Sequence, residues 1–188
     1  TGNDAFGFPV GGTSSGGTFN YAPIFISAPS TTTAQFTAEY FLTSPDPSYS
    51  ISLKAGTLHH VSSTEYWILD RTTSTANVSV SLTWASRSGG VTVLSDLRVA
   101  RWNGTQWDDH GNGSTNGSTT TGTITSSGLV TSFSPFALAS FNGNNPLPVE
   151  LTGFYSTCSG DNIELNWQTA SEKNNQGFTI QYSANGTT

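Results

Sequence analysis

The stretch 77–84, which reads N-V-S-V-S-L-T-W, decides the fold class of this chain. Apolar residues occupy every second position, with Ser or Thr between them, at Val78, Val80, Leu82 and Trp84. Successive side chains of a β-strand point to opposite faces of the sheet. The alternation therefore predicts a strand with one buried face and one solvated face.

The same period of two recurs along the chain, in residues 36–42, 163–167 and 178–182. Shorter apolar runs between turn residues predict further strands at 49–53, 66–70, 91–94, 97–102, 122–126, 136–141 and 149–154. The apolar-free run 109–121 is expected to be a solvated loop. Many short strands separated by turns predict an all-β, antiparallel β-sandwich of the jelly-roll or immunoglobulin-like kind.

Composition agrees with this fold class and excludes several functions. The 188 residues include 29 Thr, 27 Ser and 20 Gly, and only 10% are charged, against roughly 25% in a typical soluble domain. Six basic residues against twelve acidic ones give a net charge of −6, so nucleic acid is not an expected partner. Membrane insertion is not expected either, because no apolar run approaches the roughly 18 residues of a membrane span.

Two prolines and a Gly/Asn cluster predict a domain boundary near residue 145. We expect a β-sandwich domain at 1–142, a linker at 143–148 and an incomplete three-stranded module at 149–188. Such a short piece rarely folds alone, so it must pack on the first domain, continue into further sequence or pair with another chain. The start at Thr1, without Met or a signal segment, suggests a processed or excised piece.

Two C-terminal runs, PLPVELTGF (146–154) and DNIELNWQTASEKNNQGFTIQYSANG (161–186), resemble a module of secreted Bacteroidota proteins. In those proteins the module commonly precedes the C-terminal sorting domain of the type IX secretion system. Upstream motifs resemble the usual neighbour of that module, namely FGFPVG (6–11), EYWILDRT (65–72), LRVARWNGTQW (97–107) and FSPFALAS (133–140).

The resemblance implies a fibronectin-type-III-like or immunoglobulin-like second module. It also implies export, an extracellular or cell-surface location, and an accessory role without catalysis. This sequence departs from the family pattern because the second module stops after its third expected strand and no sorting domain follows.

The hairpin around Asn103-Gly104 carries the candidate binding residues. Trp102, Trp107 and Arg101 flank this turn, so we consider them as a glycan-binding or partner-binding surface. Asp108 and Asp109 are weak Ca²⁺ candidates, since carboxylate oxygens on a loop suit that ion. No other cofactor is expected.

Catalytic signatures are missing from the sequence. It contains no G-x-S-x-G nucleophile motif, and its single cysteine, Cys158, has no nearby histidine. We therefore expect a structural or adhesive module that pairs with other protein chains, including copies of itself, and builds a fibre or sheath. Its open β edge is expected at Phe178, Ile180 and Tyr182. The alternative is a carbohydrate-binding accessory module of a secreted enzyme, with polysaccharide as its partner.

Overall fold

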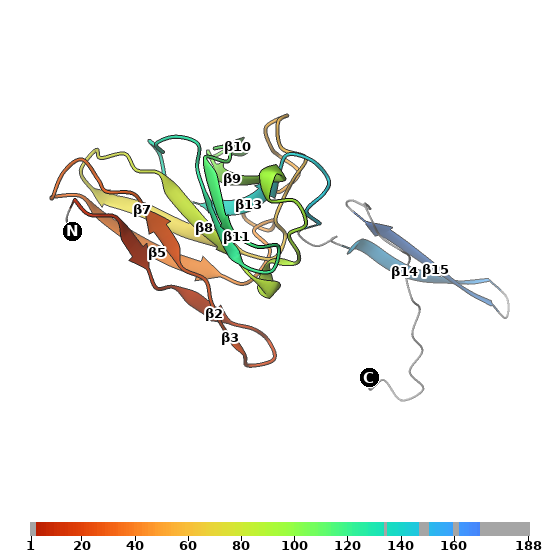
Figure 1. Cartoon of the computed structure of the whole chain (residues 1–188). Helices are drawn as coiled ribbons and strands as arrows, with labels where there is room; N and C mark the ends of the chain where they lie inside the picture. The colour runs from red at the N-terminus through yellow and green to blue at the C-terminus, as the bar shows by residue number, and fades with distance from the viewer. Residues whose placement is uncertain (1–2, 134, 147–150, 160–161, 170–188) are drawn as a thin grey trace. The chain divides into compact units, whose positions relative to one another are not determined.

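A computed structural model describes residues 3–133, 135–146, 151–159 and 162–169 (Figure 1). Contacts within the chain divide it into two units, Thr1–Pro148 and Val149–Thr188. The described regular elements are β-strands apart from two short 3-10 turns, Ser86–Ser88 and Leu94–Asp96. The all-β prediction is confirmed.

The first unit contains two antiparallel sheets. The first sheet has the order β1 (Phe6–Phe8), β4 (Ile24–Ile26), β8 (Val80–Trp84), β12 (Gly122–Thr125) and β11 (Ser114–Gly117). The second has the order β10 (Trp107–Asp109), β9 (Leu97–Trp102), β13 (Phe136–Ser140), β7 (Tyr66–Thr73) and β5 (Gln35–Phe41), and β6 (His60–Val61) also pairs with β13. A small hairpin joins β2 (Gly11–Thr13) to β3 (Phe19–Tyr21).

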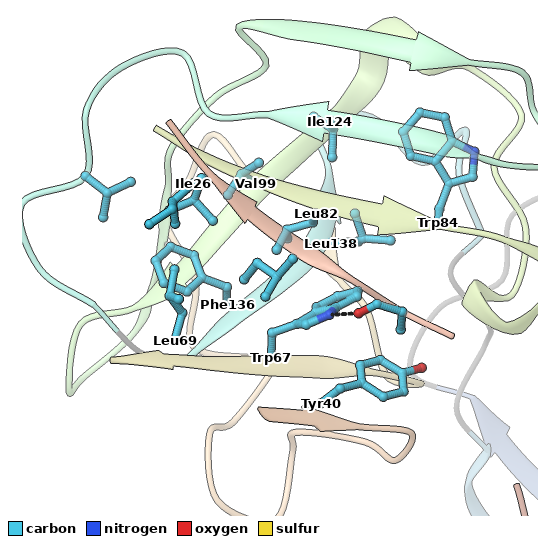
Figure 2. Close-up of a cluster of buried hydrophobic side chains, with 14 of the residues drawn as sticks. Ile26, Tyr40, Trp67, Leu69, Leu82, Trp84, Val99, Ile124, Phe136 and Leu138 are labelled. Atoms are coloured by element: carbon cyan, nitrogen blue, oxygen red, sulfur yellow. Dashed lines mark hydrogen bonds between the residues drawn. The ribbon is translucent and has the colours of Figure 1, made fainter. Parts of the chain in front are cut away.

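The inner faces of the two sheets form one hydrophobic core (Figure 2). The predicted alternation of stretch 77–84 holds, since Val80, Leu82 and Trp84 are all buried in this core. Trp67 of β7 lies at its centre, and its indole N–H donates to the carbonyl of Ala22 at 2.8 Å (Figure 2). Two sheets packed face to face in this way form a β-sandwich.

Strand β13 is buried on both faces. Phe136 and Leu138 point into the core between the sheets. Ala137 and Ala139 join a second apolar cluster on the outer face of the second sheet. Large side chains on one face and small ones on the other let a third layer of chain pack closely on this strand.

That third layer is the irregular segment 44–59, for which the sequence wrongly predicted a strand at 49–53. The backbone turns there, because the Asp46 carboxylate accepts a hydrogen bond from the N–H of Ile51 (2.9 Å) and the Pro45 carbonyl accepts one from Tyr49 (2.8 Å). Tyr49 and Ile51 still pack on the outer cluster.

The segment 91–94 is likewise not a strand. The side-chain carbonyl of Asn145 accepts hydrogen bonds from the backbone N–H groups of Thr92 (2.8 Å) and Val93 (2.9 Å), in place of a ladder partner. The expected loop 109–121, in contrast, contains β11, a polar strand that pairs with β12.

The second unit contributes the hairpin of β14 (Leu151–Ser159) and β15 (Asn162–Thr169). The strand predicted at 163–167 and residues 151–154 of the strand predicted at 149–154 fall in this hairpin, while residues 149–150 lie outside the described residues. The third predicted strand, with Phe178, Ile180 and Tyr182, lies outside the described residues.

Replacement of Gly122 by Ala tests the packing of β12 between its neighbours. A Cβ at Gly122 would lie 2.4 Å from both the Asn116 carbonyl oxygen and the ring of Trp84, and the carbonyl is part of a paired strand. We expect Gly122→Ala to lower the free energy of unfolding by about 1–3 kcal/mol in urea denaturation. The matched control is Gly128→Ala, where a Cβ meets no atom within 4 Å, and it should leave stability unchanged or slightly higher.

Candidate functional site

The predicted turn at Asn103-Gly104 joins β9 to β10. The Asn103 side-chain oxygen accepts hydrogen bonds from the N–H groups of Thr105 (2.9 Å) and Gln106 (3.0 Å), and Gly104 adopts a φ of +106°. This turn places Trp102 directly opposite Trp107 in the ladder. Their ring centroids lie 5.8 Å apart, with an interplanar angle of 68°.

Trp107 anchors the third layer of chain rather than facing solvent. Its side chain is completely buried, and its indole N–H donates to the carbonyl of Tyr49 at 3.2 Å. Its backbone N–H donates to the carbonyl of Leu53 (2.9 Å), and its carbonyl accepts a hydrogen bond from the backbone N–H of Ala55 (2.8 Å). Trp102 is half-buried, so the pair lacks the coplanar exposed rings that the glycan hypothesis requires.

Arg101 is also committed to the hairpin. Its guanidinium donates to the carbonyl of Trp102 at 3.0 Å and lies 3.8 Å from the Asp108 carboxylate. Burial lowers the pKa of Arg101, and the charge of Asp108 opposes this shift. Its Nε is buried without a hydrogen bond, and its contacts with Trp102 and Asp108 tie the side chain to the hairpin.

The two Ca²⁺ candidates hold this loop together. Asp108 accepts hydrogen bonds from the side-chain amides of Asn103 (2.8 Å) and Gln106 (3.2 Å). Asp109 accepts from the N–H of Gly111 at 2.7 Å. In the part of the chain that the structure describes, no group of three His, Cys, Asp or Glu side chains is placed to hold a metal. The geometry therefore gives Asp108 and Asp109 a role in the turn.

A buried carboxylate that the sequence analysis missed connects the two sheets. Glu65, directly before β7, is fully buried and accepts hydrogen bonds from the Tyr40 hydroxyl (2.6 Å), the Arg87 Nε (2.9 Å) and the Ser88 hydroxyl. Arg87 also donates to the carbonyl of Thr83 at 3.1 Å. Glu65 and Tyr40 belong to the second-sheet side and Arg87 follows β8 of the first sheet, so the cluster bridges the sandwich.

Burial sets the protonation of this cluster. It raises the pKa of Glu65, while the charge of Arg87 and the hydrogen bonds from Ser88 and Tyr40 act in the opposite direction. Burial and the neighbouring carboxylate also raise the pKa of Tyr40. No local motif marks this cluster, because Tyr40, Arg87 and Ser88 each lie more than twenty residues from Glu65 in the sequence.

The expected linker 143–148 is partly built into the first unit. Asn145 is fully buried, and its side-chain amide donates to the carbonyl of Val93 at 3.0 Å. Asn144 donates to the Asp96 carboxylate at 2.6 Å. These two residues therefore attach the end of the first unit to the segment 91–96.

His60 of β6 contacts Asn145 as well. Its Nε2 hydrogen-bonds the carbonyl of Asn145, and its Nδ1 lies 3.0 Å from the Nδ1 of His59. Because Nε2 must donate to a carbonyl, Nδ1 of neutral His60 accepts from His59. Burial lowers the pKa of His60 to about 4, and the nearby His59 and Lys54 contribute in the same direction.

The β14–β15 hairpin has two different faces. Cys158 pairs with Ile163 in the ladder, and Leu165 and Trp167 share their face. Thr157 pairs with Glu164 on the opposite, polar face, which also includes Tyr155 and Asn166. On the apolar face the Ile163 side chain is 69% exposed, and Cys158 is exposed beside it.

Comparisons with known proteins give no family for this chain. No family model matches it, and neither a curated protein nor a solved structure is significantly similar. Among the described residues, no helix is long and apolar enough to cross a membrane. The function must therefore be argued from the geometry of these surfaces.

Replacement of Glu65 by Gln tests the buried cluster. The substitution keeps the size of the side chain but leaves the charge of Arg87 buried without its carboxylate, so unfolding free energy should fall by about 3 kcal/mol. Glu39→Gln, on the exposed side of β5, is the control and should change stability by less than about 0.5 kcal/mol. Equal, small losses in both variants would contradict a role for this cluster in joining the sheets.

The lowered pKa of His60 predicts a loss of folding stability in mild acid. The unfolded chain binds the proton near pH 6.5 and the folded chain only near pH 4, so stability should be constant above pH 7 and fall as the pH is lowered through this window. After allowance for solvent screening, the loss is about 1–2 kcal/mol. Urea unfolding of the wild type and of His60→Gln at pH 7.5 and 4.5 measures it, and identical pH dependence in the two proteins would contradict it.

Proposed function

We propose that this chain is a non-enzymatic structural or adhesive module of a secreted bacterial surface protein, and that its C-terminal β unit associates with other copies of the chain. The amphipathic β14–β15 hairpin carries this proposal. Its apolar face includes Ile163 and Leu165 at alternate positions, as in a strand that packs against a second layer.

The apolar face of this hairpin needs another part of a protein to pack against it. A two-stranded hairpin is at best marginally stable in water, and a contiguous exposed apolar face usually marks an interaction site. Residues 170–188, the first unit, further sequence or a second copy of the chain could each pack on this face. The experiment below singles out the second copy, because only that contact depends on protein concentration.

The edges of the hairpin favour contact between chains. Soluble sheet proteins usually protect their edge strands with charged side chains, lysine above all. Within residues 151–159 and 162–169 the one charged residue is Glu164, and the whole chain has only two lysines, Lys54 and Lys173. Few charges therefore oppose the approach of another β edge, whose main-chain hydrogen bonds would supply affinity.

The extracellular location is proposed from the resemblance of residues 146–154 and 161–186 to secreted Bacteroidota modules. The abundance of Thr and Ser and the low charge are consistent with a surface protein. The alternative role in carbohydrate binding is less favoured, because Trp107 is buried and its ring is tilted against that of Trp102.

Ile163→Lys tests the role of the apolar face. Burial of an isoleucine contributes about 1.5–3 kcal/mol, so its loss should weaken self-association at least tenfold in sedimentation velocity over a concentration series. Thr157→Lys is the matched control, since it places the same charge on the polar face beside Glu164 and should associate as the wild type does.

The thiol of Cys158 gives a second measurement that needs no substitution. Cys158 lies directly opposite Ile163, so association through this face should slow its reaction with a thiol reagent as the protein concentration rises. A wild-type chain that stays monomeric at every concentration, with equal thiol reactivity throughout, would overturn the proposed function.

A further inference from the structure

A groove opens between the outer strands of the two sheets of the first unit. It has a volume of about 370 Å³ and is lined by Asp4, Phe6, Phe8, Ile26, Pro29, Ala34 and Phe36. Phe6 and Phe8 come from β1, the outermost described strand of the first sheet, and Phe36 comes from β5, the outermost described strand of the second. The groove is therefore an opening into the space between the sheets.

The two aromatic residues of β1 face the core, but Phe8 is partly buried against it and Phe6 is exposed. Phe6 pairs with Ile26, and Phe8 with Ile24, so all four side chains lie on the same face of the sheet. Ile24 and Ile26 are buried in the core, whereas Phe6 is 55% exposed. An inward-facing phenylalanine with this exposure indicates that no further described strand covers the core at this edge of the sandwich.

Neighbouring residues restrict how a ligand can enter. On the outer face of the sheet the ring of Phe25 covers Gly7, where a Cβ would lie only 2.6 Å from the ring. Towards the other end of β5, Gly12 of the β2–β3 hairpin packs on Tyr40, where a Cβ would lie 3.3 Å from the ring. We take the edge of β1 as the entrance, because Phe6 and Phe8 of that strand line the groove.

An extended strand fits this entrance. Alternate side chains of a strand lie on one face, as Phe6 and Phe8 do on β1, where their ring centroids are 4.9 Å apart. Among the described residues β1 pairs with β4 alone, so its other main-chain edge is available for a ladder. Apolar side chains would fill the groove while the backbones pair.

The chain itself carries a segment of this pattern. Residues 178–182, F-T-I-Q-Y, place Phe178, Ile180 and Tyr182 at alternate positions and contain no charge. Asp4 is the one charged residue among the described lining residues, and a segment without charge is not repelled by its carboxylate. Resting on the proposed function, we propose that the groove receives residues 178–182 of a second copy of the chain.

The proposed contact joins two different surfaces, the groove on the first unit and the segment 178–182. A contact of this heterologous kind does not close on itself unless the copies form a ring, so it extends copy by copy into a filament. Each copy within the filament then uses both its groove and its strand.

A mixture of two variants tests this arrangement. Phe6→Lys places a charge in the groove, and Ile180→Lys places one in the strand. Each variant alone should lose the groove contact, so that filament growth stops in sedimentation velocity and only association through the hairpin face is left. Their equimolar mixture should regain one groove contact for each pair of copies, because one copy keeps an intact groove and the other an intact segment 178–182.

Phe19→Lys is the matched control, since Phe19 is 62% exposed on β3 and does not line the groove. It should associate as the wild type does. A synthetic peptide of residues 177–183 keeps the test independent of variant folding. It should dissociate wild-type assemblies and shift the amide resonances of residues 4–8 and 34–36, and the same peptide with Ile180→Lys should do neither.

The outcomes separate this inference from the proposed function. Filament growth that persists in Phe6→Lys but is lost in Ile163→Lys would overturn the groove and leave the proposed function intact. A wild-type monomer would overturn both the contact between copies and the proposed self-association, whether or not its groove takes up the peptide.

Discussion

The fold of the first unit depends on the burial of β13 from both sides. Phe136 and Leu138 seal the core between the sheets, and Ala137 and Ala139 leave room for the segment 44–59 outside it. A strand with large side chains on both faces would hold that segment too far away. Trp107 could then neither join the outer cluster nor pair with Leu53, and the β9–β10 hairpin would lose its support.

Polar side chains fix the parts of this unit that apolar packing leaves free. Glu65 connects the two sheets through Tyr40 and Arg87, and Asn145 fastens the end of the unit to Thr92 and Val93. A buried polar group costs stability unless it is hydrogen-bonded, so these clusters are stable in only one arrangement. They add specificity to a core whose apolar contacts are tolerant of small shifts.

The sequence predicted those elements whose signal is local. The alternation in β5, β8 and β15 follows from a period of two, and the turn at Asn103 follows from its residue types. The prediction failed at 49–53 and 91–94, where Asp46 and Asn145 occupy the backbone N–H groups that a ladder would need. It also missed β1 and β4, since three-residue strands are too short to show a period.

The candidate sites likewise divide into those with a local sequence signal and those that depend on distant residues. The tryptophan pair was found from the sequence because the turn between its members is local, but its burial comes from a segment some fifty residues away. The exposed Phe6 gave no signal in the sequence, since an alternating strand looks the same whether or not its inner face is covered. What distinguishes a binding edge from a core strand is the absence of a neighbour, and only the assembled sheets reveal which strand stands last. Among the described residues that position is held by β1, which pairs with β4 alone and carries inward-facing aromatic rings, the features on which the proposed pairing with another strand rests.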